Sequence, residues 1–205
     1  MELLIIRHGE SEADLLGVHE GRADFPLTEI GVKQAKRMAT YIAQHYPPTI
    51  ILTSPLIRAN RTASILQESI GCELIIEQDL MEFNNGVLAG LSREEAAIKY
   101  PLPKDGRPPH LPILDGESNL EFRFRVDNIF YKVFFDYQEY ERVAIVSHGG
   151  TISNLLKAFL KQPINNEFIF STGDTGIHLL EIKGNNRMIK FLNKQEHLHV
   201  NEEKN

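Results

Sequence analysis

Arginine and histidine stand side by side where a short apolar run of the chain ends. Residues 3–6 read LLII, and Arg7, His8 and Gly9 follow directly. An Arg guanidinium is a fixed positive charge whose fork of N–H donors fits phosphate oxygens. A His ring nitrogen titrates near neutral pH and can act as a base or a nucleophile. Gly9 would let a backbone N–H approach a ligand closely. These residue types predict a site for a phosphate-like anion.

Two further apolar runs end in residues of the same kind. Thr53, Ser54 and Pro55 follow the run 49–52, and Arg58 comes one helical turn later. The run 142–146 is followed by the sequence SHGG at 147–150. The carboxyl ends of parallel strands meet at one edge of a sheet, where ligands bind in open α/β folds. Two arginines, two histidines and helix N-termini converging there would suit a phosphate group.

Strand-like and helix-like segments alternate along the chain. Strands are expected at 3–6, 49–52, 73–76, 142–146, 175–182 and 188–192. Helices are expected after an N-cap at Thr28, after a Ser54–Pro55 cap, from the Ser92 and Ser118 capping boxes, and after Gly150. This order predicts an α/β fold with a mostly parallel central sheet and helices on both faces.

The region 84–117 does not follow this alternation. It contains a proline-rich stretch without periodicity, PLPKDGRPPHLPILDGES, which is typical of a lid or binding loop. We therefore expect one domain over 1–193, with a cap insertion at about 84–117 over the carboxyl edge of the sheet. His110 in this loop could touch a substrate. The polar tail 194–205 is expected to fray.

Composition excludes several classes of function. The 205 residues carry a formal net charge of -6, which disfavours a nucleic-acid binder. No apolar run approaches the roughly 18 residues of a membrane span, and no basic leader precedes the first strand. Cys72 is the single cysteine, so no internal disulfide can form. These features predict a cytoplasmic protein with neither nucleic acid nor membrane as a partner.

Six segments together give the chain a specific resemblance. They are RHGES at 7–11, GRADFPLTEIGVKQA at 21–35, TSPLIRANRTA at 53–63, Leu80-Met81-Glu82, GES at 116–118 and VSHGG at 146–150. In order and spacing they resemble the histidine phosphatase superfamily, which includes cofactor-dependent phosphoglycerate mutases and many phosphatases. The resemblance runs through almost the whole chain.

The resemblance implies a role for each matching residue. His8 would be the nucleophile and become a phosphohistidine, and Glu82 would be the general acid and base. Arg7, Arg58 and His148 would hold the phosphoryl oxygens, with Gly149 beside them. Such a scheme splits one difficult step into two easier ones and stabilises the charge on the equatorial oxygens. It implies no metal and no other cofactor.

Other positions match less closely. Ser11 and Arg22 could line the rim of the pocket, and Arg61 stands where glutamine is frequent in the family, where it could extend the positive field or be a solvated surface residue. Asp14 stands where the family often has asparagine, and a carboxylate there would repel phosphate unless it turns away or is protonated. The sequence NNGVLAG at 84–90 departs from the usual Gly-x-Trp-Glu-Gly.

The leading hypothesis is a phosphatase that hydrolyses a small-molecule phosphomonoester through a phosphohistidine. The alternative is a cofactor-dependent phosphoglycerate mutase, which is usually longer and has more basic residues in the cap. The cap here offers Arg93, Lys99, Lys104 and Arg107. A catalytically silent phospho-ligand or protein-binding module is a third reading, against which His8 and Glu82 argue. The expected partner is a small phosphorylated metabolite of undetermined identity, and a homodimer stays open.

Overall fold

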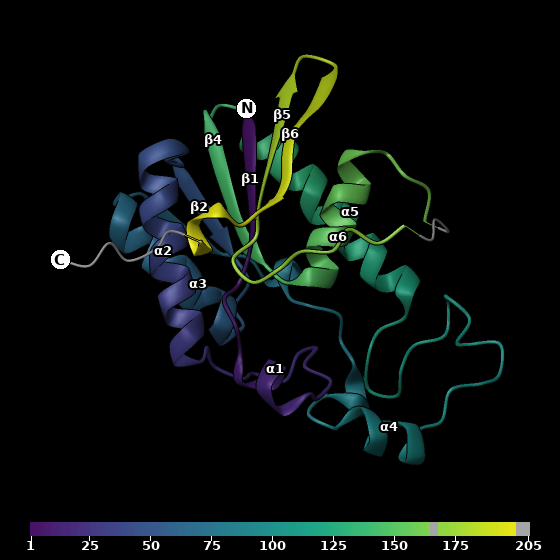
Figure 1. The fold of residues 1–205 in the computed structure, drawn as a ribbon. Coiled ribbons are helices and arrows are strands. Elements are labelled where there is room, and N and C mark those ends of the chain that lie inside the picture. Colours follow the sequence, from purple (N-terminus) through teal and green to yellow (C-terminus); the bar gives the residue numbers. More distant parts are fainter. Residues whose placement is uncertain (165–167, 200–205) are drawn as a thin grey trace.

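The computed structural model describes residues 1–164 and 168–199, and a six-stranded sheet forms its centre. The strands are β1 (Glu2–Arg7), β2 (Ile50–Thr53), β3 (Glu73–Ile76), β4 (Arg142–Ser147), β5 (Ile177–Lys183) and β6 (Asn186–Lys194). Their order is β3-β2-β4-β1-β5-β6. The first four are parallel, β5 runs antiparallel to β1, and β6 runs antiparallel to β5 (Figure 1). The prediction of a mostly parallel sheet is confirmed.

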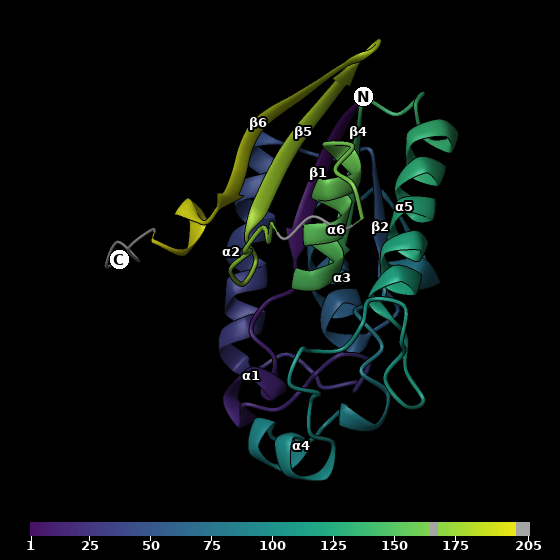
Figure 2. The ribbon, with the colours of Figure 1, turned by 90° about the vertical axis from the view of Figure 1, so that its right-hand side faces the viewer.

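Four of the helices in the described residues cover the two faces of this sheet. The helices are α1 (Glu12–Leu16), α2 (Glu29–His45), α3 (Ile57–Ile70), α4 (Arg93–Lys99), α5 (Asn119–Asp136) and α6 (Gly149–Phe159). Helices α2 and α3 lie against one face, and α5 and α6 against the other (Figures 1 and 2). Leu4 and Ile6 of β1 pack towards α2 and α3, whereas Leu3 and Ile5 pack towards α5 and α6. Both sides of β1 are buried, so its run is continuously apolar.

The helix ends follow local sequence signals with one exception. Thr28 caps α2, and the Ser92–Glu95 and Ser118–Glu121 capping boxes begin α4 and α5 as predicted. The predicted Ser54–Pro55 cap is wrong, because α3 begins at Ile57 with Leu56 as its N-cap. The Ser54 hydroxyl is instead hydrogen-bonded to a ring nitrogen of His148. The same hydroxyl oxygen also accepts from Leu56 N at 3.3 Å, so it makes one local and one long-range contact just before α3.

The cap region 84–117 lies beyond the carboxyl ends of the parallel strands, as do α1 and α4 (Figure 1). Its two ends are joined by backbone hydrogen bonds from Glu117 N to Asn84 O at 3.0 Å and from Val87 N to Leu114 O at 3.0 Å. Gly86 has a φ of +49° and packs against the Leu114 carbonyl where a Cβ would collide. The aperiodic segment is thus a hydrogen-bonded loop held at its base.

The expectation of a frayed tail from 194 is wrong for the residues the structure describes. Strand β6 extends to Lys194, and a 3-10 turn follows at Glu196–Leu198. The His197 side chain is only 2% exposed, and its Nε2 lies 2.8 Å from the Thr175 hydroxyl. The polar composition of this segment suggests a solvated tail. Nothing local indicates burial, because Thr175, the partner of His197, lies 22 residues earlier in the chain. Residues 200–205 of the predicted tail lie outside the described residues.

Two buried histidines should make the protein sensitive to acid. Burial lowers the pKa of His178 and that of His197 to about 4. His178 Nδ1 accepts a hydrogen bond from Asn193 N, so protonation would break that contact. The unfolded chain binds these protons near pH 6.5 and the folded chain does not, so the free energy of unfolding decreases as pH falls from about 6.5 to 4.

We expect His178→Gln to remove up to about 3 kcal/mol of the stability loss between pH 7 and pH 4. Urea unfolding across that range measures it. His199→Gln is the matched control, because this side chain is exposed. The same pH slope in both variants would contradict the assignment.

Candidate active site

His8 follows β1 directly and is held at the edge of the sheet by its backbone. Its N–H donates to Ser147 O at 3.0 Å, and its carbonyl accepts from Thr175 N at 3.1 Å. The ring Nδ1 lies 2.7 Å from Gly9 O, and because a carbonyl only accepts, Nδ1 carries the proton. Burial, and then the charges of Arg58 and Arg7, hold the pKa of His8 well below 6.5. The ring is therefore neutral, with its lone pair on Nε2.

Gly9 is required by packing rather than by a ligand. A Cβ at this position would collide with the carbonyl group of Gly31, at the start of α2. The Gly9 N–H donates to the Thr62 hydroxyl at 3.2 Å. The expectation that this N–H would approach a ligand is therefore wrong, because a side chain of α3 already binds it.

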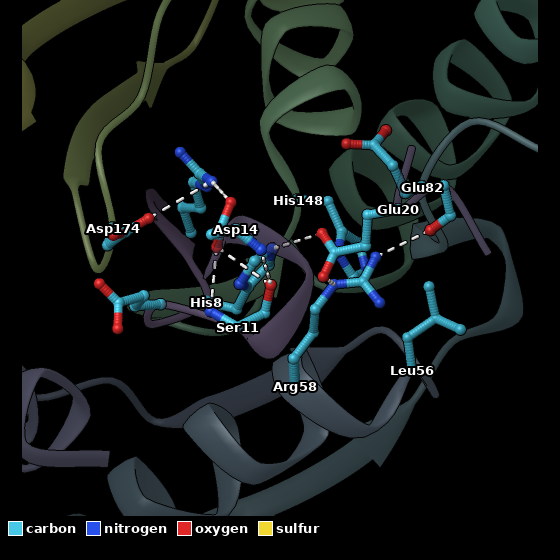
Figure 3. A network of polar contacts seen from close by, with 12 residues as sticks. His8, Ser11, Asp14, Glu20, Leu56, Arg58, Glu82, His148 and Asp174 are labelled. Atoms are coloured by element: carbon cyan, nitrogen blue, oxygen red, sulfur yellow. Dashed lines mark hydrogen bonds and ion pairs between the residues drawn. The ribbon is translucent and has the colours of Figure 1, made fainter. Parts of the chain in front are cut away.

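Arg58 reaches the same place from the first turn of α3, and it is fully buried. Its two terminal nitrogens donate to Gly21 O at 2.8 Å and to Ala23 O at 3.0 Å. Its Nε lies 3.1 Å from a carboxylate oxygen of Glu20 (Figure 3). The backbone carbonyls fix the position of the guanidinium, and Glu20 offsets its charge.

Arg7 is also paired within the protein. Its Nη1 donates to Thr172 O at 2.7 Å, and its Nη2 lies 3.3 Å from Asp174 and 3.7 Å from Asp14. Asp14 does turn its other oxygen away: Oδ2 accepts from the Ser11 N–H at 2.9 Å and closes a capping box on α1. Ser11 therefore serves as the N-cap of α1.

His148 follows β4 and is the N-cap residue of α6. Its ring centroid lies 5.1 Å from that of His8. Nε2 lies 2.8 Å from the Ser54 hydroxyl, and the buried Nδ1 has no hydrogen-bond partner among the described residues. Burial, and then Arg58 and the neighbouring charges, hold its pKa well below 6.5. The two histidines are thus a pair of neutral rings beside two arginines.

Glu82 lies at the N-terminus of α6. Its Oε2 accepts from Gly150 N at 2.8 Å, and its Oε1 accepts from Thr151 N at 3.1 Å and Phe83 N at 2.8 Å. A Cβ at Gly150 would stand 2.6 Å from Oε1, so a glycine there allows the approach. Helix N-termini present free N–H donors to anions. Both oxygens are oriented, and Oε2 accepts only one of these bonds.

Arg125 of α5 supports the Glu82 segment and was not singled out in the sequence. It donates to Asp79 O at 2.7 Å, to Met81 O at 2.9 Å and to Glu82 O at 3.2 Å. It also lies 2.7 Å from Glu117 at the end of the cap region. Nothing in the sequence around Arg125 signals this role, because its partners are backbone carbonyls more than 40 residues away.

The remaining candidates take three different positions. Gly149 lines the cavity beside His8. Arg22 stays close to the site, with Nε 3.4 Å from Glu82 O and Nη2 3.7 Å from Glu117. Arg61 is half-exposed on α3 and pairs with Glu68 at 3.2 Å, so it takes the solvated role that the sequence left open.

A cavity of about 1060 Å³ opens over this edge of the sheet. Arg7, His8, Glu20 and Glu82 form its polar base. Phe83, Phe122 and Phe170 give it apolar walls, and His110 of the cap also reaches it. Lys157 of α6 lines it as well, and burial, and then Arg123, lower the pKa of this lysine. The volume fits a small-molecule ligand.

Glu20 also lies beside His8, and the sequence motifs do not identify it as a site residue. Its Oε2 lies 3.9 Å from His8 Nε2 (Figure 3). The residue directly precedes the matched segment GRADFPLTEIGVKQA at 21–35, and this position is the signal that could have found it.

Within residues 1–164 and 168–199, none of the helices has the length and apolar character needed to cross a bilayer. The same residues contain no group of three His, Cys, Asp or Glu side chains placed to hold a metal ion.

The fold and the site define an α/β protein whose sheet edge gathers two histidines and two arginines beside one cavity. The chain belongs to the histidine phosphatase superfamily, branch 1, whose family model matches residues 3–195. The resemblance noted in the motifs is thereby confirmed.

Relatives named as phosphatases and relatives named as phosphoglycerate mutases both match most of the chain. A Hydrogenobacter thermophilus protein provisionally named phosphoserine phosphatase 2 is 29% identical over 198 residues, 95% of this chain and 96% of that one. An Escherichia coli protein provisionally named phosphoglycerate mutase GpmB is 33% identical over 171 residues, 80% of this chain and 76% of its own. The crystal structure of the alpha-ribazole phosphatase from Shigella flexneri has a TM-score of 0.83 at 26% identity, covering 95% and 97% of the two chains. The family and the relatives with phosphatase names support a phosphatase.

We expect Arg125→Met to lower the free energy of unfolding by about 2–4 kcal/mol, because three backbone carbonyls and Glu117 lose a partly buried charged donor. Urea unfolding measures the change. Arg61→Met is the matched control on an exposed ion pair, and its effect should stay within about 0.5 kcal/mol. Equal effects of the two variants would show that Arg125 does not brace the Glu82 segment.

Proposed function

We propose that the protein hydrolyses a small-molecule phosphomonoester through a phosphohistidine on His8. One observation carries the proposal. The neutral His8 ring has its proton on Nδ1, held by Gly9 O, and its Nε2 beside a cavity that Arg7 also lines. A neutral imidazole nitrogen next to fixed cations is the nucleophile that attack on phosphorus needs.

In the first step, the Nε2 lone pair forms a bond to phosphorus while the bond from phosphorus to the ester oxygen breaks. Arg7, Arg58 and His148 hold the equatorial oxygens, where negative charge spreads in the transition state. A protonated Glu82 gives its proton to the departing oxygen, which would otherwise leave as an alkoxide. The products are an alcohol and the phosphorylated His8.

In the second step, water takes the place of the alcohol. The Glu82 carboxylate accepts a proton from the water as its oxygen attacks phosphorus, and the bond between phosphorus and Nε2 breaks. Phosphate leaves, and His8 and Glu82 return to their starting protonation states. The chemistry needs no group beyond side chains and water.

The alcohol part of the substrate would lie in the cavity beyond Glu82. Apolar contact comes from Phe83 and Phe170, and the partly buried Lys157 offers one cation to a polar or acidic group. We propose a small phosphorylated metabolite as the partner. A phosphoglycerate mutase is the second candidate, because relatives of both names match the chain. The cavity wall receives His110 from the cap but none of the cap cations Arg93, Lys99, Lys104 and Arg107, which favours hydrolysis.

The product distinguishes these reactions. We expect inorganic phosphate to be released from a panel of phosphomonoesters, and also from 3-phosphoglycerate with catalytic 2,3-bisphosphoglycerate, because water is the acceptor. Formation of 2-phosphoglycerate without net phosphate release would establish the mutase instead. Absence of both products would favour a silent binding module.

A second experiment, with the same substrates, tests the nucleophile. Turnover quenched under alkaline conditions should retain an acid-labile phosphate on the wild-type chain. His8→Ala removes the attacking nitrogen. This variant should form no acid-labile phosphate, and its rate should fall by at least about a thousandfold. Full turnover by His8→Ala would exclude the covalent route.

Glu82→Gln should separate two kinds of substrate. A poor alkyl leaving group depends on the proton, whereas 4-nitrophenolate leaves without it. We expect the loss in kcat/KM to be at least about tenfold larger for alkyl phosphates. His8→Ala, which should suppress both substrates alike, serves as the comparison. Equal losses with Glu82→Gln would assign this residue a structural role.

A further inference from the structure

Glu20 lies between the proposed nucleophile and the buried arginine. Its Oε2 is 3.9 Å from His8 Nε2, and its Oε1 is 3.1 Å from Arg58 Nε. Glu20 lines the cavity, whereas Arg58 is completely buried behind it. In Figure 3 the carboxylate stands between the two side chains. A negatively charged group of this protein thus occupies the space between the two residues that would hold a phosphoryl group.

The proposed chemistry needs that same space. A phosphoryl group bonded to His8 Nε2, with an oxygen towards Arg58, would bring an oxygen against the Glu20 carboxylate. Two anions cannot share this position at close range without strong repulsion. Glu20 must therefore move out, or it must be protonated so that its O–H donates to a phosphoryl oxygen.

We propose that Glu20 is an internal competitor for the phosphoryl site, and that anion binding is linked to its protonation or displacement. This inference rests on the proposed placement of the phosphoryl group between His8 and Arg58. It makes Glu20 a positioning residue that sets the pH range in which the site accepts substrate.

An oxygen of a ligand can replace Glu20 on Arg58 without any movement of Arg58. Within the described part of the chain, neither Glu20 Oε1 nor Arg58 Nε makes a hydrogen bond, although they form an ion pair. The terminal nitrogens of Arg58 are held by Gly21 O and Ala23 O. Arg58 therefore keeps its position when Glu20 leaves, and its Nε becomes available to an oxygen of the ligand.

The charges around Glu20 allow it to titrate. Arg58 of α3, the nearby Ser11 hydroxyl and Arg7 of β1 favour its ionised form, whereas Asp14 of α1 opposes it. His8 faces it as a neutral ring. Burial outweighs the arginines and raises the pKa of Glu20 above its ordinary value. An incoming dianion would raise it further, so binding should take up a proton.

Sulfate is the probe that tests this directly, because it stays a tetrahedral dianion from pH 5 to pH 8 and cannot be turned over. Calorimetry of the full chain gives its Kd and, in two buffers of different ionisation enthalpy, the protons taken up. Wild-type Kd should tighten as pH falls, by up to about tenfold per pH unit for each proton bound.

Glu20→Gln keeps the shape of the side chain and removes its charge. We expect this variant to bind sulfate at least about tenfold more tightly than wild type at pH 8, with a smaller pH slope and less proton uptake. Because His8 and His148 remain in both proteins, the difference isolates Glu20. Glu20→Ala should show the same direction, and Glu12→Gln, an exposed residue on the nearby α1, should match wild type.

Equal or weaker sulfate binding by Glu20→Gln at every pH, or an unchanged slope, would overturn the inference. A KM that falls at high pH in Glu20→Gln, with kcat little changed, would support it independently. The two proposals fail differently. A chain with the predicted sulfate behaviour but without phosphate release would refute the hydrolase alone. A hydrolase whose sulfate affinity ignores Glu20 would refute this inference alone.

Discussion

The placement of two guanidinium groups at the carboxyl edge of the sheet, Arg58 fully buried and Arg7 partly buried, is the constraint on which the site depends. Charges taken out of water are costly unless they are paired and hydrogen-bonded. Arg58 meets this condition with two backbone carbonyls and Glu20, and Arg7 meets it with Thr172 O, Asp174 and Asp14. The loop after α1 and the segment before β5 are folded around these partners. Burial, and then these two charges, hold the pKa values of His8 and His148 well below 6.5.

A second constraint fixes Glu82, the proposed acid. Glu82 lies on neither a strand nor a helix, so contacts from two neighbouring helices fix its position. The N-terminus of α6 binds the carboxylate, and Arg125 of α5 binds the backbone carbonyl. Arg125 also pairs with Glu117, where the cap region returns to α5. Arg125 thereby connects the end of the cap region to the segment that holds Glu82.

Much of the arrangement could be predicted from local sequence. The apolar runs that precede Arg7 and Ser147 mark strands buried on both faces, and the capping boxes at Ser92 and Ser118 begin helices where expected. The failures share a physical cause. Ser54 is hydrogen-bonded to His148, and His197 to the buried Thr175. Arg125 donates to backbone carbonyls of a distant segment. Each outcome depends on a contact between distant segments, which no local pattern records.

Glu20 and Asp14 show why resemblance and geometry must be combined. A motif match assigns cations to a phosphate, and it says little about acids placed among them. The structure shows that each arginine already has a carboxylate partner. An anion that binds here must replace an internal pair rather than meet two unpaired charges, so its net gain is smaller than the cation count suggests. In exchange, the histidines and arginines are held in place before any ligand arrives, which is the preorganisation that transition-state stabilisation requires. The acidity of the site is therefore part of how its positive groups can be buried at all.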